Sequence, residues 1–260
     1  MHKRGFQRSY YDSCLYYKGS DIKEAIYLLL YVDDMLIISK ERAKIELMKS
    51  WLKSEFEMKD LGFASKILGI NIKRNRSKGL LVLDQEDYIK KIIEKFSMGD
   101  SKITKQPMTN QYILSKDQCP KTQAEKEEMS EVPYSNAVGS IMYLMVCTRP
   151  DLAYSISVLS KYMSNLGREH WKAMKWVFKY LIGTKRVGLK FKRQNSNNTI
   201  EGYSDADFVG DRDSRKSTSA YYFLVEGKCV SWRVQLQPVV ALSTTEAEYV
   251  AATEAIKEAI

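Results

Sequence analysis

Histidine and cysteine are scarce in this sequence. The chain of 260 residues holds two histidines and four cysteines. The cysteines stand far apart, at Cys14, Cys119, Cys147 and Cys229, so none has the close partner that a structural zinc site needs. Two histidines are too few to complete such a site, and they give little support to a nucleophile that depends on a histidine base. We therefore expect any chemistry to depend on carboxylates and a metal ion.

A long uncharged apolar run is also absent. The longest candidate, residues 26–38, is interrupted by Asp33 and Asp34, which argues against a membrane span. The first residues show no pattern of a signal or transit peptide. Together with the scattered cysteines, these features predict an intracellular protein, cytoplasmic or nuclear, that has no membrane partner.

The overall composition is that of a globular protein with a basic excess. Apolar residues make up 44% and charged residues 28% of the chain, enough for one large domain or two small ones. The net charge is +9 and there are 17 tyrosines, a combination that suits a nucleic-acid partner because cations neutralise phosphates. A generic basic protein has the same composition, so these numbers leave both interpretations open.

The most informative stretch is residues 26–38. Two apolar, β-prone runs flank Asp33 and Asp34, and no Lys or Arg lies among them. Each run predicts a buried strand, and the acidic pair predicts the tight turn of a β-hairpin. Adjacent carboxylates repel each other unless a cation lies between them, and Mg²⁺ meets that need with hard oxygen ligands. The alternative interpretation is a solvated turn between two core strands.

Helical and strand patterns alternate over the rest of the chain, which predicts an α/β (α+β) fold. Apolar spacing predicts helices, and alternation predicts strands. His170 is expected to begin one helix as a solvated or capping residue. The predicted helices cover residues 41–58, 84–96, 134–147, 150–164, 170–182 and 243–260, and the predicted strands residues 9–18, 66–72, 80–83, 200–209, 219–225 and 228–232.

A second acidic group lies near the end of the chain. Asp205 and Asp207 fall on one face of the predicted strand, and Glu248 falls one turn into the last predicted helix. A strand aspartate and a helix glutamate that face each other would form a divalent-metal pocket. Acids in a first helical turn usually serve the helix dipole, as Glu246 is expected to do, so this signal is weak by itself.

The order and spacing of these motifs resemble part of the Pol polyprotein of a copia-type LTR retrotransposon. Tyr31-Val32-Asp33-Asp34 resembles the palm hairpin of reverse transcriptases, and the strand–hairpin–helix unit resembles the start of an RNase H domain. Further matching motifs are Gly5-Phe6, Leu68-Gly69-Ile70, Val138-Gly139-Ser140, Thr148-Arg149-Pro150-Asp151, Ser231-Trp232 and Ala241-Leu242-Ser243.

The resemblance implies a role for each acid. Asp33 and Asp34 would bind Mg²⁺ in a polymerase palm, Asp205 and Glu248 would bind it in an RNase H site, and Asp207 would support them. The implied substrate is an RNA–DNA hybrid or another nucleic acid. The implied domains are a reverse transcriptase palm and thumb-like remnant (1–98), a mostly helical connection (99–198) and a truncated RNase H-like domain (199–260).

Two departures from the family pattern suggest an inactive fragment. Only about thirty residues precede Asp33, too few for the earlier palm strand that bears a third aspartate. Two further RNase H acids would lie beyond the last residue of the sequence. The chain is therefore expected to be a Pol fragment that is inactive alone. The alternatives are a repurposed, non-catalytic nucleic-acid-binding protein and, as an unrelated class, a structural protein whose acids are surface charge.

Overall fold

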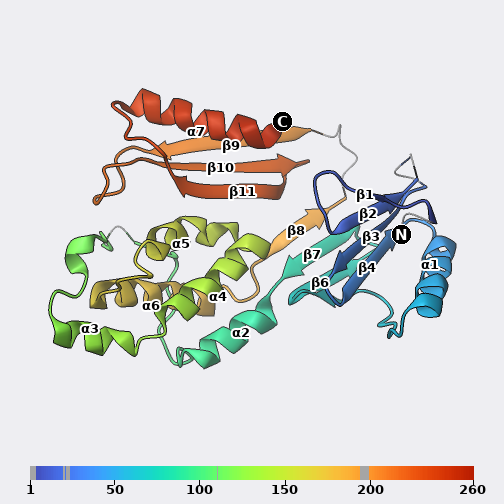
Figure 1. Cartoon of the computed structure of the whole chain (residues 1–260), viewed down its shortest axis with the longest axis horizontal. Coiled ribbons are helices and arrows are strands. Elements are labelled where there is room, and N and C mark those ends of the chain that lie inside the picture. The colour runs from blue at the N-terminus through green and yellow to red at the C-terminus, as the bar shows by residue number, and fades with distance from the viewer. Residues whose placement is uncertain (1–3, 20, 22–23, 110, 194–198) are drawn as a thin grey trace. The chain divides into compact units, whose positions relative to one another are not determined.

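The computed structural model describes residues 4–19, 21, 24–109, 111–193 and 199–260. By packing, the chain divides into two compact units, Met1–Leu68 and Gly69–Ile260. The described residues form helices and three antiparallel sheets, so the predicted α/β (α+β) class is confirmed (Figure 1). The predicted domain boundaries at residues 98 and 198 follow the family pattern rather than packing, and they stay predictions.

The first unit is an antiparallel meander backed by one helix. Ile26 and Leu28 alternate along β3 and are buried, because this face of the sheet packs against Met48 and Leu52 of α1. Phe6 completes this small core. The elements are β1 (Gln7–Arg8), β2 (Leu15–Lys18), β3 (Ile26–Tyr31), β4 (Asp34–Ser39), α1 (Arg42–Glu55) and β5 (Lys66–Ile67).

The single strand predicted over residues 9–18 is wrong in its first part. Residues 9–14 form a loop between β1 and β2. Ser9 Oγ accepts the backbone N–H groups of Tyr11 and Asp12, at 3.2 and 3.4 Å, and Asp12 Oδ1 accepts that of Cys14 at 2.8 Å. These short polar side chains bond the backbone locally and so compete with strand pairing.

The second unit is built around a helical core. Its core cluster holds nineteen buried apolar side chains among the described residues, most of them from helices, and Phe178, Leu144 and Ile141 are among the most enclosed. A sheet of β6, β7 and β8 adjoins the helices, and β8 joins it from after α6. The elements are β6 (Ile70–Asn75), β7 (Leu80–Asp84), α2 (Glu86–Lys95), α3 (Gln123–Ser130), α4 (Tyr134–Cys147), α5 (Ala153–Ser160), α6 (Arg168–Gly183) and β8 (Leu189–Lys192), with 3₁₀ turns at Lys116–Gln118 and Pro150–Leu152.

The same unit ends in a second sheet, in the order β11-β10-β9, with α7 over one face (Figure 1). Ala247 and Ala251 of α7 are fully buried, because small side chains let the helix approach the sheet closely. On the other side, Trp232 Nε1 donates to the Met145 carbonyl oxygen at 3.1 Å, which ties β11 to α4. The elements are β9 (Ile200–Asp207), β10 (Thr218–Val225), β11 (Lys228–Leu236) and α7 (Thr244–Ala259).

Arg149 and His170 are among the polar side chains that are fully enclosed in the second unit. His170 caps α6, because its Nδ1 accepts the Gly167 N–H at 2.8 Å, while its Nε2 lies 3.1 Å from the Ser115 carbonyl oxygen. The expected capping role is confirmed and the expected solvation is wrong. The helix begins two residues earlier than predicted, which turns His170 inward beneath the ring of Tyr162 at 3.9 Å.

Within the described ranges, no helix combines the length and the apolar character that a membrane crossing requires. The four cysteines are free thiols. The expected compartment, cytoplasm or nucleus, stays a prediction.

Candidate metal-binding sites

The first acidic site is the turn between β3 and β4. Tyr31 pairs with Asp34, so the connecting loop consists of Val32 and Asp33 alone. Val32 has φ 51°, the left-handed conformation that two-residue hairpins require. Asp34 therefore opens β4 instead of lying within the turn, a shift of one residue from the prediction. The reason is the strand register, which pairs Leu28 with Ile37 and leaves Asp34 opposite Tyr31.

Both carboxylates of this turn are open to solvent. Asp33 and Asp34 are exposed, and the neighbouring Val32 is 81% exposed. Among the residues that the structure describes, no hydrogen bond or ion pair engages either carboxylate. Their oxygens are thus available as a donor set of the kind that Mg²⁺ prefers, and two ligands leave room for water or phosphate oxygens.

The second acidic site begins on β9. Asp205 pairs with Ala220 of β10 and Asp207 pairs with Thr218, so the two acids share one face as predicted. The opposite face of this sheet meets α7. There Tyr221, the partner of Ser204, donates its hydroxyl to Glu258 of α7 at 3.2 Å. Strand alternation therefore puts Asp205 on the face that points away from α7.

Glu248 lies in the second turn of α7, between buried Ala247 and Ala251 in the sequence but itself exposed. The helix begins as predicted at Ser243, whose Oγ accepts the Glu246 N–H at 3.1 Å. Although α7 packs along β9, no hydrogen bond joins Glu248 to Asp205 in the described part of the chain. Because Asp205 lies on the face away from α7, an ion shared with Glu248 would have to lie beyond an edge or an end of β9, whose outer edge pairs with no other described strand.

Neither site contains a third metal-binding side chain from the described residues. No group of three or more His, Cys, Asp or Glu there is arranged to hold a metal ion. Each site therefore offers two carboxylates, at adjacent positions in the hairpin and on separate elements in the second unit. Metal binding by all four acids stays a prediction.

One acid near β9 escaped the sequence analysis. Asp211, in the loop after β9, is only 5% exposed. It accepts bonds from Lys161 Nζ and from the Ser214 hydroxyl. Burial raises the pKa of Asp211, but the bonds from Lys161 and Ser214 outweigh burial and lower it overall. No local pattern could have revealed this, since Lys161 lies fifty residues earlier.

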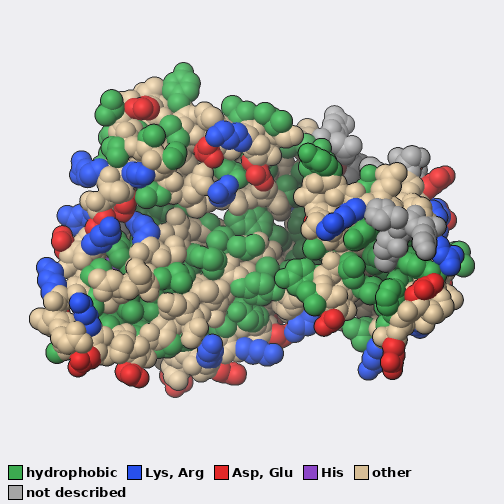
Figure 2. All heavy atoms as spheres, viewed as in Figure 1, with side chains coloured by type: hydrophobic (Ala, Val, Ile, Leu, Met, Phe, Trp, Pro, Cys, Tyr) green, Lys and Arg blue, Asp and Glu red, His purple; other side chains and the backbone are tan. Residues whose placement is uncertain are grey.

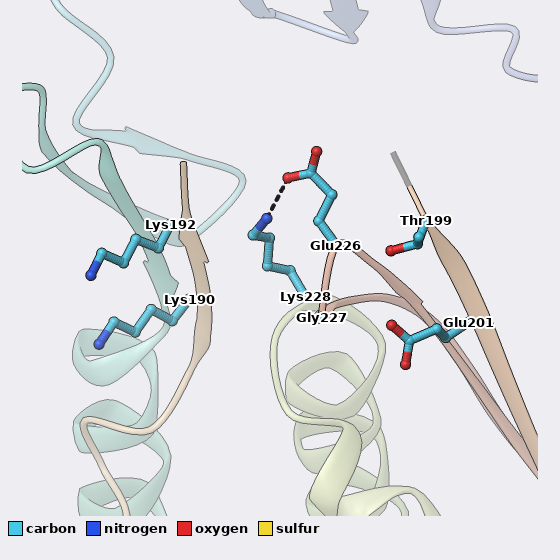
Figure 3. A pocket seen from close by; sticks show the side chains of 7 residues that line it. All are labelled: Lys190, Lys192, Thr199, Glu201, Glu226, Gly227 and Lys228. Atoms are coloured by element: carbon cyan, nitrogen blue, oxygen red, sulfur yellow. Dashed lines mark hydrogen bonds and ion pairs between the residues drawn. The ribbon is translucent and has the colours of Figure 1, made fainter. Parts of the chain in front are cut away.

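Basic side chains line a small pocket in the second unit (Figure 3). It measures about 350 Å³ and lies between β8 and the β10–β11 turn. Glu226 accepts from Lys228 Nζ at 2.6 Å, which neutralises that lysine. Lys190 and Lys192 project from β8 on the other side and point away from Glu226 in Figure 3. The lining thus carries three lysines and two glutamates, so its charges largely offset one another.

The basic excess is not gathered into one patch on the face shown in Figure 2. Lys and Arg side chains lie interleaved with Asp and Glu over that face. Sequence-independent attraction of a polyanion is therefore spread over many weak contacts there.

Comparison with known proteins gives three informative relatives. Residues 1–110 match the family model described as reverse transcriptase (RNA-dependent DNA polymerase). The whole chain is 48% identical to a retrovirus-related Pol polyprotein from transposon TNT 1-94 of Nicotiana tabacum, of which it spans 19%. It is 31% identical over 99% of its length to a Ty5-1 transposon protein of Saccharomyces cerevisiae, of which it covers 81%.

The third relative is shorter. It is the secreted RxLR effector protein 161 of Plasmopara viticola. This chain is 53% identical to it over 132 residues, which are 51% of this chain and 92% of that protein. No solved structure matches the chain.

Proposed function

Since the chain belongs to the retrovirus-related Pol polyproteins of transposons, with a reverse transcriptase domain in its first part, we propose that it is a polymerase and nuclease fragment. In this proposal the first unit carries the metal-binding turn of a reverse transcriptase palm. Residues 199–260 carry the beginning of an RNase H-like domain. The chain spans about a fifth of the tobacco polyprotein, so the activity of the whole protein is itself part of the proposal.

The observation that supports the proposal most strongly is the acidic turn. Asp33 and Asp34 are exposed and adjacent, and the described residues supply no cation to offset them. Mg²⁺ held there would activate a primer 3′-hydroxyl or a water and stabilise the leaving oxygen. The role of the chain is to hold the two carboxylates at the end of a paired β-hairpin, which fixes where the nucleic acid must present its reacting phosphate.

The second pair would hold an ion at the open edge of β9. Asp205 lies on the face away from α7, and Glu248 lies on α7 itself, so the edge is where both carboxylates can reach. Two ligands bind Mg²⁺ weakly, because the ion keeps most of its waters. We propose that Asp207 supports this pair from two residues further along the strand.

We further propose that the polypeptide is catalytically incomplete. Two-metal phosphoryl transfer uses ions about 4 Å apart, and two carboxylates cannot hold both. The test is primer extension on an RNA template with Mg²⁺ or Mn²⁺, and no extension is expected. Extension that Asp34→Asn abolishes would show that the two acids suffice and would overturn the incompleteness.

The RNase H assignment has its own test. The residues that follow this stretch in the tobacco relative can be fused after Ile260. We expect the fusion to cleave RNA in a hybrid, and the same fusion with Asp205→Asn to fold without cleaving. Cleavage by the Asp205→Asn fusion would remove Asp205 from the site.

The second candidate function is nucleic-acid binding without catalysis, which the net charge of +9 favours. Both candidates predict weak, sequence-independent binding to RNA–DNA hybrid that falls steeply with salt. Fluorescence anisotropy over a salt series tests this. An affinity that does not change with salt concentration would exclude the electrostatic mechanism. Activity gained in the fusion then separates a catalytic fragment from a binding protein.

A further inference from the structure

Two tyrosine rings project almost completely into solvent from the loop between β1 and β2. Tyr10 is 96% exposed and Tyr11 is 93% exposed. Their ring centroids lie 5.6 Å apart in an edge-on arrangement at 86°. Large apolar rings are costly to leave in water, so two neighbouring rings at this level of exposure need an explanation.

The loop that carries the rings is tightly bonded. The Ser9 N–H donates to the Leu15 carbonyl oxygen at 2.8 Å, which closes the base of the loop. Inside it, Ser9 Oγ and Asp12 Oδ1 accept backbone N–H groups, and Arg8 Nε donates to the Ser13 carbonyl oxygen at 2.7 Å. The rings are therefore presented by a loop whose backbone is already ordered, which lowers the entropy lost on binding.

The topology of the sheet puts this loop beside the acidic turn. In an antiparallel meander, the β1–β2 and β3–β4 connections lie at the same end of the sheet. The Leu30 N–H donates to the Cys14 carbonyl oxygen at 2.9 Å, so the end of the loop lies beside the last residues of β3. Asp33 lies in the turn three residues beyond Leu30, so the two are at most roughly 10 Å apart.

We propose that Tyr10 and Tyr11 form a stacking platform for unpaired bases of the polynucleotide whose phosphate would approach the Mg²⁺ that the proposed function assigns to Asp33 and Asp34. This inference rests on the proposed function. Every base has a π-face, so such a platform works without sequence preference. Arg8, at the base of the loop and in no ion pair among the described residues, supplies a cation for the adjoining phosphate.

The size of the surface favours this occupant over others. Two tyrosines bury at most about 500 Å², less than the ~800 Å² that each partner of a specific protein complex buries. Apart from Cys14, the other residues of the loop are polar, so the loop itself adds little apolar area to the two rings. A single-stranded overhang needs only the area of one or two bases.

The experiment uses the full chain and two substrates, an RNA template with a 5′ overhang annealed to a DNA primer, and the same hybrid with blunt ends. We expect Tyr10→Ala/Tyr11→Ala to weaken binding of the overhang substrate by about tenfold, the order of loss for one unstacked base. The blunt hybrid and the salt slope should not change. Arg8→Ala should instead lower the salt slope by about one.

Two controls match the double variant. Tyr10→Phe/Tyr11→Phe keeps both rings and should bind as the wild type does. Tyr249→Ala removes a tyrosine that is 72% exposed on α7 and should have no effect. A 2-aminopurine in the overhang gives a readout on the unaltered chain, since stacking on a ring quenches its fluorescence.

The outcomes separate the two proposals. If the wild type binds both substrates and Tyr10→Ala/Tyr11→Ala binds each of them as tightly as the wild type does, the platform is wrong and the proposed function stands. Equal weakening on blunt and overhang substrates also overturns the platform, because unpaired bases are then not what the rings contact. If the wild type binds no nucleic acid, both proposals fail.

Discussion

The two compact units differ in how much apolar surface they enclose. Among the described residues, the first unit has a core cluster of five buried side chains and the second one of nineteen. The first unit also exposes large apolar groups at the end that carries the acidic turn, where Tyr31 is 51% and Val32 81% exposed. The second buries even polar groups, including Arg149 and His170.

This difference indicates a division of roles. Core burial is the main source of folding free energy, so most of the stability belongs to the second unit. In the first unit, an exposed hairpin and loop carry acids and aromatic rings. Four predictions test this division of roles. Each is measured on the unfolding transition of one unit, which requires the two units to unfold in separate transitions.

The largest effect is expected from Arg149→Ala. The Arg149 side chain is fully buried, donates to both Asp151 carboxylate oxygens, and donates to the carbonyl oxygen and hydroxyl of Thr184. Truncation removes these bonds, leaves the Tyr180 hydroxyl as the remaining side-chain donor to Asp151 among the described residues, and should cost the second unit about 3–5 kcal/mol. Chemical denaturation measures the loss.

The matched control is Arg168→Ala. Arg168 forms an ion pair with Glu128, but both side chains are more than half exposed. Such pairs contribute roughly 0–1 kcal/mol. A loss below about 1 kcal/mol for Arg149→Ala would mean that the buried network is not a stabilising part of the second unit.

Leu28→Ala tests the smaller core. Leu28 is fully buried between β3 and α1, and its truncation should cost about 2–5 kcal/mol. Because the first unit has little other core, we expect its thermal transition to shift or vanish while that of the second stays in place. Leu47→Ala, at an α1 position that is 72% exposed, should change little. A shift of both transitions together would show that the units unfold as one.

Between pH 7.5 and 5.5, a pH effect is expected in the second unit. Burial lowers the pKa of His170 below its ordinary 6.5, opposed by its bond to Ser115. The unfolded chain therefore takes up the proton first as pH falls. The stability that depends on neutral His170 is complete above about pH 6.5. It is lost progressively as the pH falls from there toward the lower pKa of His170 in the folded protein. Melting at pH 7.5 and 5.5 measures this, and His170→Gln should remove the part of the pH dependence that lies in this window.

The smallest effect is expected at the acidic turn. Val32 is a β-branched residue with φ 51°, a conformation that costs such a residue about 1 kcal/mol or more. Asn tolerates it, so Val32→Asn should raise the stability of the first unit by about 1 kcal/mol. Val32→Ala removes the β-branch, but Ala tolerates the left-handed conformation less well than Asn. It should therefore raise the free energy of unfolding by less than Val32→Asn. Destabilisation by Val32→Asn would mean that the valine side chain makes contacts that outweigh the strain.

The hairpin shows how much of the structure can be predicted from local sequence. Apolar β-prone runs on both sides of two turn-forming acids predicted β3, β4 and the exposed carboxylates. The position of the turn was off by one residue, because cross-strand pairing sets the register, and β4 is partly exposed instead of buried as predicted. The loop at residues 9–14 was missed, since the bonds from Ser9 and Asp12 to the backbone compete with a strand in a way that β-propensity does not register.

By itself, the sequence determined the acidic hairpin, the alternation of helices and strands, and the family. Each depends on neighbours in the chain, on periodicity, or on motif order. Tertiary structure decided that Asp205 faces away from α7, that His170 is enclosed beneath Tyr162, and that Lys161 reaches Asp211. These relations join residues that are distant in sequence, or set which face of an element is covered. They arise only when helices and sheets pack, because packing alone fixes which side chains leave water.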